Sequence, residues 1–143
     1  MTCLAIDIGA SSGRHIVGWR DKAGVLQTRE VYRFPNGMDE VEGHLVWDTE
    51  RLEREVRTGI DRALERFPDL VSLSIDTWGV DYVLLRGEEP VKPCYAYRDG
   101  RTEAVIDRVH AIVPFAELYA RTGIQFQKET KGVDLNADVS ERF

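Results

Sequence analysis

The sequence predicts an α/β fold in which a meander of antiparallel strands is followed by helix and strand crossovers. Three observations support this class. Short apolar runs separated by turn residues open the chain, a helical apolar repeat occupies residues 49–67, and another apolar run follows at residues 71–76. With 143 residues, of which 43% are hydrophobic and 31% charged, the chain suits one globular domain with a core of moderate size.

The first three strands are expected within the first 34 residues. Cys3–Ile8 is a short apolar run that stops at the small residues 9–13, and these must form a turn. The second and third strands are expected at residues 14–19 and 25–34, with a turn at residues 21–24 between them. Consecutive strands joined by short turns predict antiparallel pairing.

Residues 49–67 are expected to form an amphipathic helix. Asp48 or Thr49 suits its N-cap, acidic residues in the first turn suit the positive end of the helix dipole, and Pro68 ends the helix. Apolar side chains recur at spacings of three and four residues, which places them on one face: Leu52, Val56, Ile60, Ala63 and Phe67.

The second half of the chain is expected to contain strands and then helices. Residues 71–76 predict a buried strand, and residues 80–85 predict a second one after an interruption. A helix follows Thr102, and a short helix at residues 115–121 ends at Gly123, where a left-handed C-cap glycine belongs. The apolar face of the helix after Thr102 is formed by Val105, Val109 and Ile112.

Charge and cysteine content narrow the classes of partner. A net charge of −6 disfavours nucleic acid and anionic membrane surfaces as partners. No apolar stretch approaches the roughly 20 residues of a membrane span, and the first residues lack the features of a signal peptide. Cys3 and Cys94 belong to no zinc or disulfide pattern, so two free thiols in a reducing cytoplasm are expected.

A first group of candidate functional residues runs from Asp7 to Arg14. Glycines at both ends of a serine pair let backbone N–H groups approach a phosphate closely, and the hydroxyls add donors. Asp7 is placed to hold Mg²⁺, through water since this ion keeps much of its hydration shell, and Arg14 suits neutralisation of phosphate charge. The run matches neither a Walker A loop nor a dinucleotide fingerprint. A plain hairpin turn would have the same composition, so this run alone leaves both readings open.

A second group lies at the end of the strand at residues 71–76. It consists of Asp76, Thr77, Trp78, Gly79 and Asp81. Carboxylates accept hydrogen bonds from sugar hydroxyls, aromatic faces pack on sugar C–H surfaces, and ligand sites in α/β sheets lie beyond the carboxyl ends of strands. The alternative is that the tryptophan belongs to the core and Asp76 caps a turn.

Two further features are expected to be structural. Arg98 and Asp99 form either a brace for the site or a surface ion pair, and the surface pair is the default expectation. The three histidines, His15, His44 and His110, lie near no recognisable nucleophile motif, so a hydrolase triad is not expected.

Taken together, these groups resemble the rhamnulokinases of the FGGY group of carbohydrate kinases. The match runs from about Leu4 to Gln127, and the combination of motifs is specific although no single run is. The matching runs are Ala5-Ile6-Asp7, Gly9-Ala10-Ser11-Ser12-Gly13-Arg14, Tyr32-Arg33-Phe34, Trp47-Asp48, Ser74-Ile75-Asp76-Thr77-Trp78-Gly79-Val80-Asp81, Tyr97-Arg98-Asp99, Arg101-Thr102 and Thr122-Gly123-Ile124-Gln125-Phe126.

The resemblance implies part of the first lobe of an actin/Hsp70/hexokinase-like, ribonuclease H-like fold. It also implies transfer of the γ-phosphoryl group of ATP to the 1-hydroxyl of L-rhamnulose, with Mg²⁺, in rhamnose catabolism. ATP phosphates would contact Ala10, Ser11, Ser12, Gly13 and Arg14, with Asp7 near the metal ion. The sugar would contact Gly79, and by placement Asp76, Thr77 and Asp81 are weaker candidates.

The chain departs from the family in two ways. The family's catalytic base and adenine-binding residues lie farther downstream than this sequence extends, so no catalytic base is expected here. The match also stops after Gln127, which divides the chain into a kinase-like segment, 1–127, and a polar tail, 128–143, expected to be disordered.

Three functions stay open at this point. The chain is an inactive N-terminal segment of a sugar kinase, a non-catalytic sugar- or nucleotide-binding or interaction module derived from one, or an active enzyme completed by a second chain. A missing second lobe would also leave apolar surface uncovered, so self-association is expected.

Overall fold

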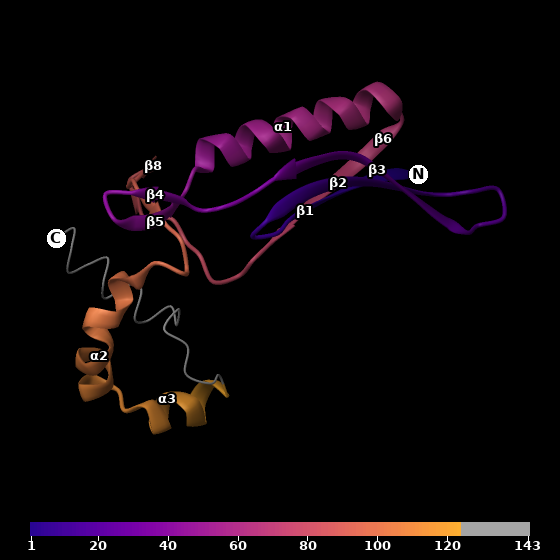
Figure 1. The fold of residues 1–143 in the computed structure, drawn as a ribbon. Coiled ribbons are helices and arrows are strands. Elements are labelled where there is room, and N and C mark those ends of the chain that lie inside the picture. Colours follow the sequence, from indigo (N-terminus) through magenta and orange to yellow (C-terminus); the bar gives the residue numbers. More distant parts are fainter. Residues whose placement is uncertain (124–143) are drawn as a thin grey trace. The chain divides into compact units, whose positions relative to one another are not determined.

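The computed structural model describes residues 1–123 and divides into two compact units (Figure 1). The first unit consists of Met1–Asp39 and Trp47–Gly79, and the second of Glu40–Val46 and the residues from Val80 onward. The proposed tail, 128–143, and the domain boundary at 127 lie outside the described residues. No helix within the described part of the chain is long and apolar enough to cross a membrane.

The first unit is built on a four-stranded sheet with the strand order β3-β2-β1-β6. β1 pairs with β2 and β2 with β3 in antiparallel fashion, whereas β1 and β6 run parallel. The predicted meander and crossover are therefore confirmed. The strands are β1 (Thr2–Ile8), β2 (Ser12–Arg20), β3 (Leu26–Pro35) and β6 (Leu70–Thr77).

Helix α1 (Thr49–Arg66) provides the crossover between β3 and β6 and packs on β1, β2 and β3. Asp48 is its N-cap, and its carboxylate accepts a hydrogen bond of 2.8 Å from the backbone N–H of Arg51. The predicted apolar face of the helix packs on the sheet. The buried core of this unit consists of Leu4, Ile6, Ile8, Val17, Val31, Phe34 and Ala63.

Strand alternation gives the sheet two different faces. Leu4, Ile6 and Ile8 point toward α1, so Cys3 and Asp7, at the intervening positions, lie on the opposite face. Residues paired across neighbouring strands lie on the same face of the sheet. The pairs of β1 with β2 and with β6 therefore show which residues of those two strands lie on each face.

Gly13 is required by packing on the α1 face. A Cβ at this position would lie 2.1 Å from the ring of Phe34, which is closer than any side chain allows. The glycine therefore contributes to the core as well as to the turn that precedes it.

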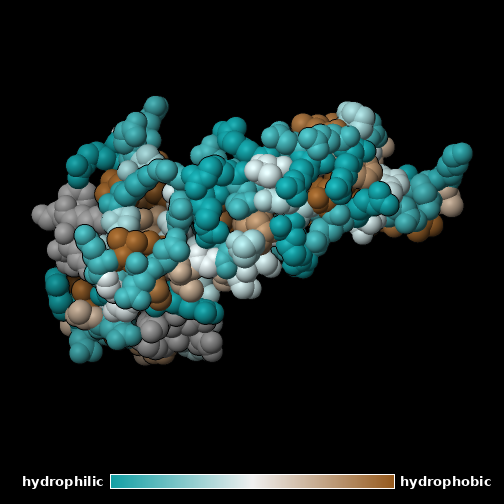
Figure 2. Space-filling model, turned by 45° about the horizontal axis from the view of Figure 1, so that its top comes forward, coloured by the Kyte–Doolittle hydropathy of each residue, from teal (hydrophilic) through white to brown (hydrophobic). Residues whose placement is uncertain are grey.

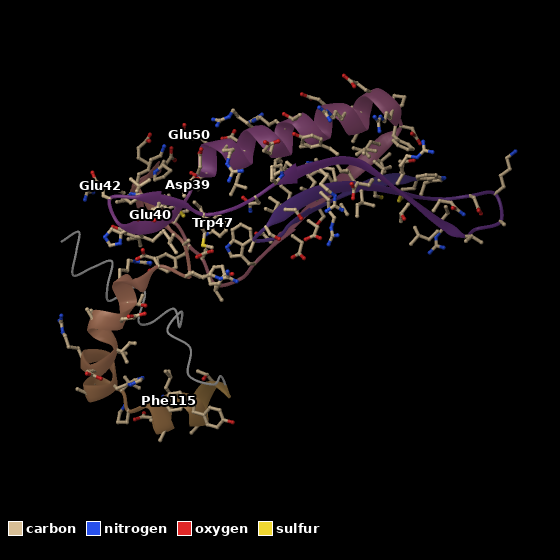
Figure 3. The ribbon with its side chains drawn as sticks, in the orientation of Figure 1. Asp39, Glu40, Glu42, Trp47, Glu50 and Phe115 are labelled. Atoms are coloured by element: carbon tan, nitrogen blue, oxygen red, sulfur yellow. The ribbon has the colours of Figure 1, made fainter. Side chains whose placement is uncertain are left out.

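The second unit contains short strands and helices. β4 (Asp39–Val41) and β5 (His44–Trp47) belong to a three-stranded sheet of order β4-β5-β9, with β9 at Cys94–Tyr95. Sequence analysis missed the β4–β5 hairpin, whose tight turn places Glu42 and Gly43 at φ 52° and 84°. Figure 3 labels Glu40 and Glu42 on this hairpin.

The predicted strand at residues 80–85 is wrong. Pairing begins only at β7 (Leu85–Arg86), which forms a two-residue ladder with β8 (Glu89–Pro90). The turn between them contains Gly87 at φ 65°. The apolar residues before β7 have a strand-like composition, but strand formation depends on a neighbouring strand, which composition does not reveal.

The last described elements are helical, as predicted. They are a 3₁₀ helix (Gly100–Val105), α2 (Ile106–Ile112) and α3 (Phe115–Thr122). Val105 is buried and Val109 packs against it, whereas Ile112 is 77% exposed. Gly123 caps α3 at φ 68°, and its N–H donates to the carbonyl of Tyr119 over 2.8 Å.

Candidate functional site

Three of the predicted site residues come together on the open face of the first unit's sheet. β1 and β6 are parallel neighbours, so their carboxyl ends lie side by side, and Asp7 is in register with Asp76. Arg14 is the antiparallel partner of Asp7 on β2. Asp76 lies 62 residues after Arg14 in the sequence, and the sheet register makes Asp7, Arg14 and Asp76 adjacent.

Arg14 and Asp7 form an exposed ion pair. The Nε and Nη2 atoms of Arg14 each lie 2.7 Å from Oδ2 of Asp7, and both side chains keep more than two-fifths of their surface exposed. An exposed pair contributes little to folding stability. Because both side chains are exposed, the guanidinium of Arg14 and the carboxylate of Asp7 are both accessible to a charged ligand.

The turn between β1 and β2 is held by backbone hydrogen bonds. The N–H of Gly9 donates to the carbonyl of Ser12 over 2.9 Å, and the N–H of Asn36 donates to the carbonyl of Ser11 over 3.0 Å. The side-chain amide of Asn36 donates to the carbonyl of Gly9 over 2.8 Å. Within residues 1–123, no protein group accepts a hydrogen bond from the N–H of Ala10 or Ser11.

Sequence analysis missed Asn36 and its neighbour Arg51. Asn36 lies in a Pro-Asn-Gly run whose composition indicates only a turn, and Arg51 is one of several charged residues on α1. No local sequence signal connects either residue to the turn at residues 9–12. Only the return of β3 alongside β2 brings Asn36 to that turn.

The carboxylates fit a hydrated magnesium ion. Mg²⁺ in phosphoryl-transfer sites commonly takes one or two carboxylates, with water and substrate phosphate oxygens completing its shell. Asp7 and Asp76 provide two neighbouring carboxylates of this kind. Among the described residues no group of three or more His, Cys, Asp or Glu side chains gathers, so a site with a full set of protein ligands is not formed there.

The other predicted sugar contacts are not gathered at the same point. Thr77 pairs with Ile8 and lies on the opposite face of the sheet from Asp76. Gly79 is the last residue of the first unit, and apart from its two chain neighbours no described residue has an atom within 4 Å of the position that a Cβ would occupy there. Asp81 belongs to the second unit.

Trp78 packs as a core residue. Its ring lies 4.3 Å from that of Trp47, centroid to centroid, at an interplanar angle of 34°, and it contacts the buried core of the first unit. Trp47, labelled in Figure 3, is buried. The arrangement favours the expectation that Trp78 belongs to the core rather than to a sugar site.

The expectation of a surface ion pair at Asp99 is wrong. Asp99 is buried and accepts hydrogen bonds from the N–H groups of Leu45 and Arg101 and from Nδ1 of His44. Burial by itself would raise the pKa of this carboxyl, but the hydrogen bonds from Leu45, Arg101 and His44 outweigh it and lower the pKa. Asp99 therefore braces β5 against the 3₁₀ helix, as an ionised carboxylate within the second unit.

Sequence comparison finds curated rhamnulokinases. The enzyme of Klebsiella pneumoniae subsp. pneumoniae is 42% identical over 127 residues, which are 87% of this chain and 26% of that protein. The enzyme of Halalkalibacterium halodurans is 44% identical over 126 residues, 87% of this chain and 27% of that protein. The Bacillus subtilis enzyme is 40% identical over 129 residues, with 89% of this chain and 26% of that protein covered. No family model matches the chain.

Structural comparison finds sugar kinases. Gluconate kinase from Lactobacillus acidophilus matches 99% of this chain with a TM-score of 0.73 at 12% identity, over 28% of its own chain. A carbohydrate kinase from Novosphingobium aromaticivorans matches 97% of this chain with a TM-score of 0.68 at 20% identity, over 29% of its own chain. The chain is thus related in sequence to the rhamnulokinases, of whose length it spans about a quarter, and it shares the fold of the corresponding part of sugar kinases.

Proposed function

We propose that this chain forms the phosphate-binding part of an ATP-dependent kinase that phosphorylates L-rhamnulose at its 1-hydroxyl. The observation that carries the proposal is the adjacency of Asp7, Asp76 and Arg14 at the carboxyl ends of two parallel strands, beside a glycine-serine turn. The sequence relationship to rhamnulokinases supports this choice of substrate.

The turn suits a triphosphate. The N–H groups of Ala10 and Ser11 have no protein acceptor among the described residues, and the hydroxyls of Ser11 and Ser12 are neighbours of those groups. Backbone donors in such a concave turn bind anions, and Arg14 would neutralise phosphate charge. Gly13 lets this turn sit directly on the core, because no side chain fits there.

Asp7 would hold Mg²⁺ through water, with Asp76 as its neighbour. When bound, the ion would shield the charge of the phosphate oxygens. Arg14 would then pass from the carboxylate of Asp7 toward the phosphates. The sugar would contact Gly79, and the exposure of Gly79 supports this contact. Asp76, Thr77 and Asp81 are proposed as weaker candidate contacts from their placement in the sequence alone.

The chain by itself is proposed to be inactive, because none of its carboxylates matches the catalytic base of the family. We also propose a domain boundary at residue 127; the alignments with rhamnulokinases, which extend over 126 to 129 residues, are compatible in length with a kinase-like segment of this size. The free thiols of Cys3 and Cys94 support a reducing compartment such as the cytoplasm.

The test has a binding arm and a turnover arm on the purified 143-residue chain. In the first, ¹⁵N-labelled chain is titrated with Mg·ATP, and shifts of the Ala10–Arg14 amide signals are expected. Arg14→Met should weaken binding by about tenfold or more, the effect of one charged hydrogen-bonding group. Arg20→Met is the matched control, because it removes the same charge from the opposite end of β2.

In the second arm, ADP release is measured with Mg·ATP and L-rhamnulose. Binding without turnover, from protein that circular dichroism shows to be folded, supports the proposal. Turnover proportional to chain concentration would overturn the proposed inactivity, and turnover that rises with the square of the concentration would favour completion by a second copy. Absence of any Mg·ATP-dependent shift in the turn would overturn the phosphate site. Tight sugar binding with no response to Mg·ATP would favour the non-catalytic module.

A further inference from the structure

We infer that Asn36 is a positioning residue for the phosphate-binding turn, and that Arg51 fixes the orientation of its side-chain amide. This inference rests on the proposed function of that turn. It is argued from the hydrogen bonds that connect α1, the end of β3 and the turn at residues 9–12, all within the first unit.

Asn36 engages two carbonyl groups of the turn at once. Its backbone N–H donates to the carbonyl of Ser11 over 3.0 Å, and its side-chain amide donates to the carbonyl of Gly9 over 2.8 Å. In the same turn the carbonyl of Ser12 accepts from the N–H of Gly9. Three carbonyl oxygens of this turn are therefore directed at protein donors.

The direction of these carbonyls sets the direction of the amides. In a trans peptide the C=O and N–H groups point in opposite directions, and the cis bond in the described structure is Lys92–Pro93, far from this turn. Holding the carbonyl of Gly9 toward Asn36 consequently turns the N–H of Ala10 away from the protein. A phosphate oxygen then meets an N–H donor at Ala10 and not a repelling carbonyl oxygen.

Arg51 decides which way the Asn36 amide points. Its Nη2 atom donates to Oδ1 of Asn36 over 3.2 Å, and its guanidinium also donates to the carbonyls of Pro35 and Gly37. Guanidinium nitrogens can only donate, so the oxygen of the Asn36 amide must face Arg51 and its NH₂ group must face Gly9. The position of Arg51 is itself fixed by the first turn of α1, where its backbone N–H bonds to Asp48.

The experiment measures binding of Mg²⁺ with inorganic tripolyphosphate to the 143-residue chain by ¹⁵N NMR titration. Asn36→Ala removes the donor to Gly9 and is expected to weaken binding by about tenfold, the effect of one hydrogen bond of ordinary strength. Arg51→Met leaves Asn36 in place but frees its amide to rotate, and a loss of roughly threefold is expected. Arg57→Met removes the same charge from an exposed position on α1 and is expected to bind as the unchanged chain does.

A second readout concerns the turn without ligand. In Asn36→Ala, ¹⁵N relaxation should show greater mobility of the Ala10 and Ser11 amides on the picosecond to nanosecond timescale, while the rest of the sheet keeps its order parameters. A merely structural contact would alter the thermal midpoint but not the affinity for tripolyphosphate. Should Asn36→Ala fail to fold, Arg51→Met still tests the inference.

The outcomes separate the two claims. If the unchanged chain shows no tripolyphosphate-dependent shift in the turn, the phosphate site proposed above fails. If the unchanged chain binds and both Asn36→Ala and Arg51→Met bind equally well, the positioning role is overturned while the phosphate site stands. Equal losses in Arg51→Met and Arg57→Met would mean that only net charge matters, which would also overturn the role of Arg51.

Discussion

The two faces of the first unit's sheet differ although they are made from the same strands. The face under α1 is apolar and buried, with Leu4, Ile6 and Val17 at its centre. The open face has Asp7, Arg14 and Asp76 at the carboxyl ends of the parallel strands. Residues that are adjacent in the chain therefore have different roles, one in the core and the next on the open face. Substitutions one position apart are expected to affect either folding or ligand binding.

The contrast between the faces is not absolute. A shallow hollow on the open face is lined mainly by apolar and small side chains, including Cys3, Ala5 and Ile16. On the α1 face, Leu73 and Ile75 of β6 are about half exposed, because α1 packs chiefly on the other three strands. On the face drawn in Figure 2, hydrophobic residues reach the surface as brown patches. The self-association predicted from such surface stays a prediction.

The largest difference between the faces is expected for Ile6 and Ala5. Ile6→Ala should lower the free energy of unfolding by about 2–5 kcal/mol, because it leaves a cavity under α1. Ala5→Ser, one residue earlier on the exposed face, should change it by less than roughly 0.5 kcal/mol. Urea unfolding followed by circular dichroism measures both. Equal losses would show that the open face is covered in solution.

The pH dependence of stability should sharpen the comparison. Burial lowers the pKa of His15, on the α1 face, below its ordinary value of 6.5, and this outweighs the opposing effects of the Val56 carbonyl and Glu55. Its Nε2 lies 3.1 Å from that carbonyl, and its buried Nδ1 has no partner among the described residues. The fold therefore favours the neutral form of His15.

The sign of the effect follows from proton binding. Below pH 6.5 the unfolded chain takes up a proton at this histidine that the folded chain resists, so unfolding becomes more favourable. The contribution of His15 is complete above pH 6.5 and is lost as the pH falls through the folded-state pKa. Urea midpoints between pH 5 and pH 8 should show this slope. His15→Phe should reduce the slope, and an unchanged slope in His15→Phe would assign it to other groups.

A small effect on stability is also expected at the candidate site. Asp7→Asn breaks the exposed ion pair with Arg14 but also relieves repulsion from Asp76, so the unfolding free energy should change by less than about 1 kcal/mol. Loss of affinity for Mg·ATP should accompany this small change. A destabilisation as large as that of Ile6→Ala would mean that Asp7 is structural, and its place in the phosphate site would be lost.

Much of the first unit could be predicted from the sequence, because its signals are local. The strand runs, the periodicity of α1 and the Asp48 cap each depend on neighbours within a few residues. Two features depend instead on which strand lies alongside: the β4–β5 hairpin and the absence of strand pairing at residues 80–84. The amino-acid composition of a segment does not show which strand will be its neighbour. The second unit was accordingly predicted less well than the first.

The candidate site divides in the same way. Asp7, Arg14 and the glycine-serine turn could be found from residue types in one run, and Asp76 from its position at the end of a strand. Asn36 and Arg51 could not, because their relation to the turn exists only after β3 has folded back. The burial of Asp99 likewise depends on β5, 54 residues earlier in the chain.

The two edge strands of the four-stranded sheet, β3 and β6, differ in how readily a further strand could pair with them. β3 presents charged residues such as Arg29 and Arg33 and ends at a proline, which discourage the addition of another strand. β6 presents Val71, Leu73 and Ile75, and within residues 1–123 no strand pairs with its outer edge. In concentrated solutions of this chain, the edge of β6 should therefore pair with strands of other copies and form assemblies. The substitution Val71→Lys should reduce this association, because a charge on an edge strand opposes pairing.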